Sequence, residues 1–290
     1  MPSTYTVVVV SAVMHAYWNF LIKRSGGTAV FVGLSKIAEA VVYAPVFAVV
    51  VTLSTGGIAA PISTAAILVV VGATLTLVNY VALARGYSRG DLSVVYPLSR
   101  GAGLLFLPGF GFLAFGEQVN LTGWIALALI LAGLVVITRP SQHTRWTTVP
   151  APAVVYALLA GLAAAGYTVW DKLAIRTLPM FVYFYAYSVL VAVAYAAFLV
   201  AKVPTTEIVA EWRLHRVPIV MVGVLNTAAY LLVLAALRNG TSTYVIAIRQ
   251  LSIVFGVALG VWQLNEPLTP PKSGGVTLLL AGCILVAFAR

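Results

Sequence analysis

Long apolar stretches, separated by short polar segments, fill nearly the whole chain of 290 residues. Each stretch has on the order of 20 residues, the length that a helix needs to cross the hydrocarbon core of a bilayer. The pattern predicts ten membrane-spanning helices, near residues 4–24, 29–53, 63–85, 91–115, 121–138, 152–175, 180–201, 216–237, 243–264 and 272–289. No connection between them is long enough to hold a soluble domain.

A shift of the chain against itself shows two copies of one unit. A shift of 149 positions places Arg100 on Arg249 and Glu117 on Glu266. Shifts of 149 to 152 also pair Trp18 with Trp170, Asn19 with Asp171, Arg24 with Arg176, Tyr80 with Tyr230, and Gly133 with Gly282. Each copy holds an odd number of spans, so the second copy must enter the bilayer inverted.

The predicted fold is therefore an all-α membrane protein whose ten transmembrane helices form two inverted five-helix repeats. We expect the first repeat at residues 1–140, a linker at 141–151 and the second repeat at 152–290. The first span lacks the basic leader of a signal peptide and contains Trp18 and Asn19 where a cleaved peptide has small residues, so we expect it to be retained.

Composition points to the same class of protein. Hydrophobic residues make up 62% of the chain and charged residues 8%, and the mean hydropathy is +1.04. Soluble domains are about a quarter charged. We therefore predict a multi-pass protein of the cell (inner) membrane. Because Cys283 is the one cysteine, no intrachain disulfide can form.

The net charge of +10 predicts a membrane orientation rather than a nucleic-acid partner, because the basic residues are scattered and form no patch. Loop parity places ten basic residues on one side, namely Lys23, Arg24, Arg85, Arg89, Arg139, Arg145, Lys202, Arg213, Arg216 and Lys272. The other side has four, namely Lys172, Arg176, Arg238 and Arg290. The positive-inside rule then places both termini outside the cell.

Three basic residues fall well inside predicted spans: Lys36, Arg100 and Arg249. An ionisable group in hydrocarbon costs about 2.5–3.5 kcal/mol on insertion scales, so it normally faces a cavity or a partner. An arginine cannot escape burial by losing its proton. The two arginines are therefore candidates for substrate binding. Lys36 also fits an internal ion pair with Glu39, three residues further on.

Helical spacing places several polar and aromatic residues on common faces, as expected for the walls of a cavity. The predicted substrate-binding residues are Trp18, Asn19, Tyr80, Tyr96, Arg100, Trp170, Asp171, Tyr230, Arg249 and Gln250. The aromatic members also fit plain packing or interfacial positions, and Asp171 with Lys172 also fits a wetted helix end. Glu39 and Asp171 are candidates for carrying a coupling proton. His15 fits a structural hydrogen bond or proton transfer.

Other intramembrane features predict structure rather than chemistry. Glu117 and Glu266 end matching spans, where a carboxylate beside a helix start is favourable. Gly256 and Gly260 have the small-xxx-small spacing of close helix contacts. The prolines Pro97 and Pro108 predict breaks in the fourth span, which are tolerated where a helix lines a cavity or bends.

Several chemistries have no matching motif in the sequence. There is no G-x-x-x-x-G-K-[ST] loop for nucleotide-driven pumping. The three histidines, His15, His143 and His215, are too far apart in the sequence to suggest a zinc site. There is no G-x-S-x-G elbow. We therefore predict neither an enzyme nor a metal or other cofactor.

Several motifs resemble those of a known family. They are His-Ala-Tyr-Trp-Asn at 15–19 followed by Lys23, Tyr-Pro-Leu-Ser-Arg-Gly at 96–101, and Gly-Glu or Asn-Glu at 116–117 and 265–266, each before a glycine-containing last span. With the paired repeats, they resemble EamA-type permeases of the drug/metabolite transporter superfamily over nearly the whole chain. Members of that superfamily are linked to amino acids, nucleotide sugars, metabolites and drugs, and a similar Trp-Asn and lysine pattern resembles phosphonate-associated members.

The resemblance has two departures. Ile246 occupies the place of Pro97 in the second copy, so the two halves need not bend alike. Relatives commonly keep both termini in the cytoplasm, against the charge count of this chain.

These observations favour a secondary transporter that moves a small polar anion, such as an amino acid, an organic acid, a phosphate or a phosphonate, by alternating access. The reason is charge, because the three buried cations are offset only by Glu39 and Asp171. Two alternatives stay open: an exporter of cationic or aromatic drugs, for which those acids would be the binding groups, and a membrane scaffold that transports nothing. The expected partners are a small-molecule substrate and the lipid bilayer; proton coupling and a homodimer are left open.

Overall fold

The structure is a computed structural model that describes residues 2–53, 61–90, 92–137 and 150–289. Within these ranges the chain is helical and contains no strand. Almost all of the predicted linker 141–151 lies outside the described residues, as do Arg139, Arg145 and Arg290. The domain boundaries therefore stay a prediction.

Eleven helices make up the described residues. The first half contains α1 (Pro2–Arg24), α2 (Ala29–Leu53), α3 (Ile62–Tyr87), α4 (Leu92–Phe115) and α5 (Leu121–Ile137). The second half contains α6 (Ala151–Thr177), α7 (Met180–Lys202), α8 (Thr205–Asn239), α9 (Ser242–Arg249), α10 (Leu251–Leu264) and α11 (Pro270–Val286).

These helices make ten spans, because α9 and α10 meet at Gln250 and form one apolar stretch, Ser242–Leu264. Eight spans are long and apolar enough to cross a membrane, and α5 and α11 are shorter apolar helices of 17 residues each. Large exposed side chains such as Leu113 and Trp262 are apolar, as expected for surfaces that face lipid tails. The predicted all-α, ten-span fold class is confirmed.

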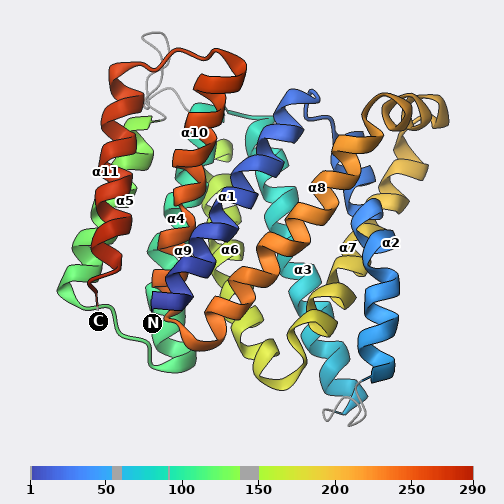
Figure 1. Cartoon of the computed structure of the whole chain (residues 1–290), viewed down its shortest axis with the longest axis horizontal. Helices are drawn as coiled ribbons and strands as arrows, with labels where there is room; N and C mark the ends of the chain where they lie inside the picture. Colours follow the sequence, from blue (N-terminus) through green and yellow to red (C-terminus); the bar gives the residue numbers. More distant parts are fainter. Residues whose placement is uncertain (1, 54–60, 91, 138–149, 290) are drawn as a thin grey trace.

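The second half is inverted relative to the first. In Figure 1, α1 rises from the end marked N, whereas α6 descends to its connection with α7. Both chain ends lie at the same edge of the bundle, as an even number of spans requires.

Helix contacts follow the same symmetry. The first helix of each half packs against the other half: α1 contacts α8, α9 and α10, and α6 contacts α3 and α4. The second helices, α2 and α7, pair with each other, as do the last helices, α5 and α11. The two repeats are therefore interleaved in a single bundle, and any central space is bounded by both.

Glycines bring α5 and α11 together at one side of the bundle. A Cβ on Gly133 would lie 2.7 Å from the Gly275 carbonyl oxygen, and a Cβ on Gly282 would lie 2.7 Å from the Ala126 carbonyl oxygen. The close contact predicted for Gly256 and Gly260 is wrong: a Cβ on Gly256 would meet nothing within 4 Å, and Gly260 faces the Glu266 side chain. In membranes such small residues allow helices to approach closely, but here α5 and α11 supply them.

Two predicted breaks are placed differently in the structure. Helix α4 continues through Pro97 and Pro108 as one helix, whereas its counterpart, without a proline at Ile246, is divided at Gln250. The span with the prolines is thus one continuous helix, whereas its counterpart in the second half is two helices. The packing of α4 on α6 can hold the helix despite the lost backbone hydrogen bonds.

Helix α8 begins before the predicted span at residue 216. Residues 205–214 are helical, and His215 has non-helical angles (φ −123°, ψ 19°). Pro218 explains this kink, because a proline cannot donate to the carbonyl four residues earlier and clashes with it.

The motif Gly-Glu or Asn-Glu ends matching helices in the two halves. Gly116 and Asn265 have left-handed angles, with φ 67° and φ 52°. The following backbone N–H groups, of Glu117 and Glu266, donate to carbonyls six residues earlier, over 3.2 and 3.1 Å. A left-handed residue at C′ is a common way to end a helix, and here it fixes where each glutamate side chain begins.

Candidate substrate-binding cavity

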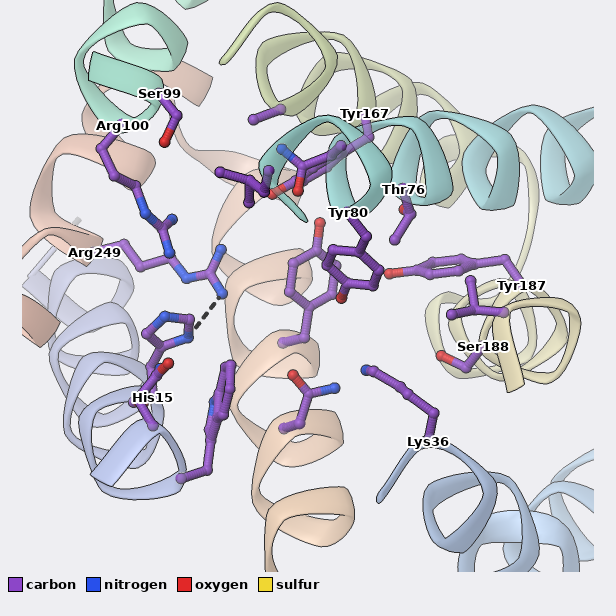
Figure 2. Close-up of a pocket in the computed structure, with 18 of the residues that line it drawn as sticks. His15, Lys36, Thr76, Tyr80, Ser99, Arg100, Tyr167, Tyr187, Ser188 and Arg249 are labelled. Carbon is purple, nitrogen blue, oxygen red and sulfur yellow. Dashed lines mark hydrogen bonds between the residues drawn. The ribbon is translucent and has the colours of Figure 1, made fainter. Parts of the chain in front are cut away.

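A cavity of about 260 Å³ lies between the two repeats. Side chains from α1, α2, α3 and α4 of the first half and from α6, α7, α8 and α9 of the second half line it. It reaches Tyr87, the last residue of α3, and so extends toward the side where Arg85 and Arg89 lie. Figure 2 shows polar side chains from these helices pointing toward one another across this space.

Most of the predicted site residues meet at this cavity. Seven of them line it: Trp18, Asn19, Tyr80, Tyr96, Arg100, Tyr230 and Arg249. Gln250 lines a smaller cavity of about 40 Å³ beside it, which Arg100 and Arg249 also line. Trp170 and Asp171 line neither cavity.

The two matched arginines come together at one end of the cavity. In Figure 2, Arg100 and Arg249 extend from different helices and lie near each other. The Arg249 guanidinium lies 3.2 Å from His15 Nδ1 and 5.3 Å from the centre of the Tyr230 ring, and Arg100 lies 5.4 Å from the centre of the Tyr96 ring. Within the described chain neither arginine forms a salt bridge with a carboxylate.

Hydrogen-bond donors at the cavity wall are left without partners. Trp18 Nε1 and Arg249 Nε are buried and have no hydrogen-bond partner among the described residues. Buried donors normally have a partner, so the wall offers donors to a ligand that brings acceptors.

The ion pair predicted between Lys36 and Glu39 is present. Lys36 Nζ lies 3.0 Å from Glu39 Oε2, and the same oxygen accepts a 3.0 Å hydrogen bond from Asn226 Nδ2 on α8. Lys36 and Asn226 line the cavity, whereas Glu39 lies behind them and is 2% exposed.

Asp171 lies in a buried cluster rather than at a wetted helix end. It is 1% exposed and accepts hydrogen bonds from the Tyr183 hydroxyl, at 2.6 Å, and from the Tyr230 hydroxyl. The wetted-end interpretation is wrong because α6 continues to Thr177 and α7 and α8 cover the carboxylate. Its neighbour Trp170 donates from Nε1 to the Leu68 carbonyl oxygen at 2.8 Å, which is a packing role.

The sequence analysis missed several lining residues. They are Leu83, Tyr87, Ala164, Phe184, Tyr187, Ser188, Val191, Thr76 and Ser99. A signal existed for Tyr187, because a shift of 151 positions places it on Lys36. Small hydroxyl and apolar side chains gave none, since serine, threonine and alanine are common throughout these spans.

The electrostatics of the wall are one-sided. Lys36, Arg100 and Arg249 line the cavity, and among the described residues no aspartate or glutamate does. Glu39 offsets Lys36 from behind, so the charge left over belongs to the arginine pair.

The fold and this site define a class: a polytopic helical membrane protein in which two inverted repeats enclose a polar cavity. The family model described as "EamA-like transporter family" matches residues 151–288. The second half of the chain is therefore similar to the EamA-like transporter family, and the resemblance to EamA-type permeases is confirmed. The apolar spans and this similarity agree with the predicted multi-pass protein of the cell (inner) membrane.

Curated relatives match a shorter part of the chain. Spermidine export protein MdtI of Shigella flexneri is 39% identical over 61 residues, which are 21% of this chain and 56% of that protein. The protein of the same name from Escherichia coli (strain K12 / DH10B) is 38% identical over the same number of residues and the same shares. The chain thus spans about half the length of the curated relatives it matches.

One solved crystal structure shares the fold over nearly the whole length. The TM-score is 0.76, the sequence identity is 13%, and the alignment covers 99% of this chain and 97% of the other. The overall arrangement is therefore one that has been observed by experiment.

Proposed function

We propose that this protein is a secondary transporter of a small anion. The observation that supports this most is the cavity wall, whose described residues include two arginines and a lysine but no carboxylate. Burying such cations without partners is costly, and an anion in the cavity removes that cost. The unpartnered donors of Trp18 and Arg249 also favour a ligand that is rich in acceptors.

The size of the cavity favours a metabolite over a drug. Pockets for drug-sized ligands are about 300–1,000 Å³, and this cavity is about 260 Å³. Carboxylates, phosphates and phosphonates all match a paired guanidinium site, because guanidinium forks bind planar or tetrahedral anions through two hydrogen bonds.

Export of a polycation is the second candidate, because the relatives are spermidine exporters. Aromatic rings at the wall, such as Tyr80 and Tyr230, are able to contact a cation. The charges argue against it: Glu39 is behind the wall and already holds Lys36, and Asp171 is enclosed by two tyrosines.

Transport would proceed by alternating access between the two repeats. The cavity extends toward the side of the basic loops, and the positive-inside rule makes that side cytoplasmic. The opposite end is packed around Asp171, Tyr183 and Tyr230. The inverted repeats allow the two ends to exchange these arrangements. The roles of individual residues, the orientation and a homodimer stay predictions.

The test measures the flux of radiolabelled phosphate, succinate and glutamate into proteoliposomes. The flux of spermidine, the substrate of the second candidate function, is measured in parallel. We expect uptake of an anion, and a loss of roughly 10- to 100-fold in Arg100→Ala and Arg249→Ala, the range for removing a hydrogen bond to a charged group. Arg85→Ala is the control, because Arg85 is exposed and does not line the cavity. Spermidine flux without anion flux, or anion flux that both cavity variants retain, would reject the proposal.

A further inference from the structure

We propose that Glu39 is a proton-binding site that couples proton movement to anion movement. An anion in the cavity shares the Lys36 ammonium with Glu39, and Glu39 then takes up a proton that crosses the membrane with the anion. This inference rests on the proposed anion transport.

The surroundings of Glu39 leave its charge dependent on one group. The carboxylate is 2% exposed. Its Oε2 accepts hydrogen bonds from Lys36 and from the neutral amide of Asn226, and its Oε1 is buried with no hydrogen-bond partner among the described residues. A buried carboxylate is tolerated only when it is paired and hydrogen-bonded. Lys36 is therefore the only cation that bonds to Glu39 in the described chain.

Lys36 faces the cavity as well as Glu39. Figure 2 shows its ammonium group extending into the space between Tyr80 and Ser188. An ammonium group has three donors, and Glu39 uses one of them. The remaining donors are available to an anion, and that anion brings its negative charge next to Glu39.

Charge counting then gives the step. With the cavity empty, one ammonium group balances one carboxylate. An anion that the two arginines hold and that also reaches Lys36 makes Glu39 share its one ammonium partner, in a site screened little by water. A proton from the side to which the cavity is open adds to the Glu39 carboxylate, which becomes a neutral carboxylic acid, and no bond other than O–H forms. When the anion leaves on the opposite side, the proton leaves with it and the Lys36–Glu39 pair forms again.

The other groups around this pair do not supply a second counter-charge. Tyrosine hydroxyls interact electrostatically with it: Tyr43 on α2, Tyr80 on α3 and Tyr195 on α7. From α8 the facing polar group is the Asn226 amide. Tyr43 donates to the Val224 carbonyl oxygen, so its hydroxyl is already engaged.

Asp171, the other fully buried acid among the described residues, lacks these properties. Both of its oxygens accept hydrogen bonds from tyrosines, no cation bonds to it, and it does not line the cavity. Because Tyr230 and Arg249 line the cavity and both act on Asp171, the control for Glu39→Gln is instead Glu207→Gln, whose side chain is exposed and does not line the cavity.

The experiment uses proteoliposomes with the membrane potential clamped at zero and the same three labelled anions. At equal pH on both sides, exchange of internal for external anion reports anion transport alone. With a gradient of one pH unit, one coupled proton per anion allows about tenfold accumulation on the alkaline side. We expect this in the wild type and in Glu207→Gln, whereas Glu39→Gln exchanges anion but accumulates it about onefold.

Each result has a defined meaning. Accumulation by Glu39→Gln at the wild-type level overturns the proton site, as does an equal loss of accumulation in Glu207→Gln. Absence of exchange in the wild type rejects anion transport itself. If Glu39→Gln does not fold, Glu39→Asp is compared with the wild type by infrared difference spectroscopy. We expect the addition of an anion to increase the intensity of the band of a protonated carboxyl group in both proteins. The frequency of this band should differ between them because of the substitution. A band that Glu39→Asp leaves unchanged, or no band in an anion-binding wild type, overturns the site.

Discussion

Two lysine–glutamate bridges occupy matching places in the two repeats, yet only one of them is buried. Lys172 on α6 binds Glu117 beyond the end of α4, and Lys23 on α1 binds Glu266 beyond the end of α10. Each bridge therefore joins the first helix of one half to the fourth span of the other. The side chains of Lys172 and Glu117 are 7% and 9% exposed, whereas those of Lys23 and Glu266 are 62% and 30% exposed.

The partners of the two bridges explain the difference. Glu117 also accepts hydrogen bonds from the backbone N–H of Ser242, at 2.9 Å, and from its hydroxyl, at 3.1 Å. It thus lies beside a helix start, as predicted, although that helix is α9 of the other half rather than α5. Lys172 also donates to the Gly240 carbonyl oxygen at 2.6 Å. Glu266 has only a second lysine, Lys272, at 3.3 Å.

The comparison teaches that the two ends of the bundle are in different states, although their local structure is the same. Both glutamates follow the same C-cap, and both sit above a glycine. The end with Glu117 is closed by contacts between the halves. The end with Glu266, toward which the cavity extends, is more exposed to solvent. Sequence similarity between the repeats thus fixes the partners but not how tightly they are enclosed.

The largest effect should come from breaking the buried bridge. We expect Glu117→Gln to lower the stability of the protein by about 3–5 kcal/mol, because it leaves the Lys172 ammonium buried without its counter-charge. Thermal unfolding of the purified protein in detergent measures this. Glu266→Gln is the matched control, and equal losses in both variants would contradict the proposed difference between the ends.

The glycines under the two glutamates sharpen the comparison. A Cβ on Gly111 would lie 2.6 Å from Glu117 Oε2, whereas a Cβ on Gly260 would lie 3.0 Å from Glu266 Oε2. We expect Gly111→Ala to cost about 1–3 kcal/mol, as for overpacking, because the Glu117 side chain is held by Ser242. Gly260→Ala should cost less, since the Glu266 side chain is free to move into water. Unfolding midpoints of the two variants, compared side by side, would refute this if their order were reversed.

Substitutions of two matched tyrosines test the closed end through a smaller expected change in stability. Tyr230 donates to Asp171, whereas Tyr80, its counterpart at a shift of 150 positions, lines the open cavity and forms no hydrogen bond to Asn19 in the described structure. Tyr230→Phe should cost about 1–2 kcal/mol because it removes one donor from a buried carboxylate. Tyr80→Phe should change stability by at most about 0.5 kcal/mol. Similar melting temperatures for both would show that the Asp171 cluster does not hold the closed end together.

The smallest effect concerns acid and salt at the exposed bridge. Hydrogen bonds from Lys23 and Lys272 lower the pKa of Glu266. A lowered carboxyl pKa stabilises the folded protein above the pKa of the unfolded chain, and that contribution is lost as pH falls through the folded value. Lys23→Ala should remove roughly 0–1 kcal/mol near neutral pH, with less effect in high salt or in acid. A loss that is the same at all pH values and salt concentrations would count against this assignment.

Much of the fold was predictable because apolar stretches and internal repeats can be read from the sequence without knowing how the helices pack. The spans agree with the helices to within a few residues, apart from α8, and the 149-residue shift correctly paired Arg100 with Arg249. The pairing of Lys36 with Glu39 followed from their spacing on one helix, since residues three apart share a face.

The remaining parts depend on how helices meet, which no spacing within one helix reveals. One interpretation of the sequence placed Asp171 at a solvated helix end. That interpretation was wrong because Asp171 is enclosed by tyrosines from α7 and α8, which its own helix does not reveal. Gly256 has the spacing of a contact but no neighbouring helix within reach. The roles of the lining residues stay predictions, because position at a cavity is not proof of binding.

The pairing of α5 with α11 has a consequence for how the chain matures. The two helices are separated by more than a hundred residues of sequence, and their glycines leave each surface shaped for the other. Until α11 has been synthesised, the glycine surface of α5 lacks the helix that it packs against in the folded protein. The first repeat therefore completes its helix packing only when the last helix is inserted. A chain that ends before Pro270 lacks the packing partner of α5.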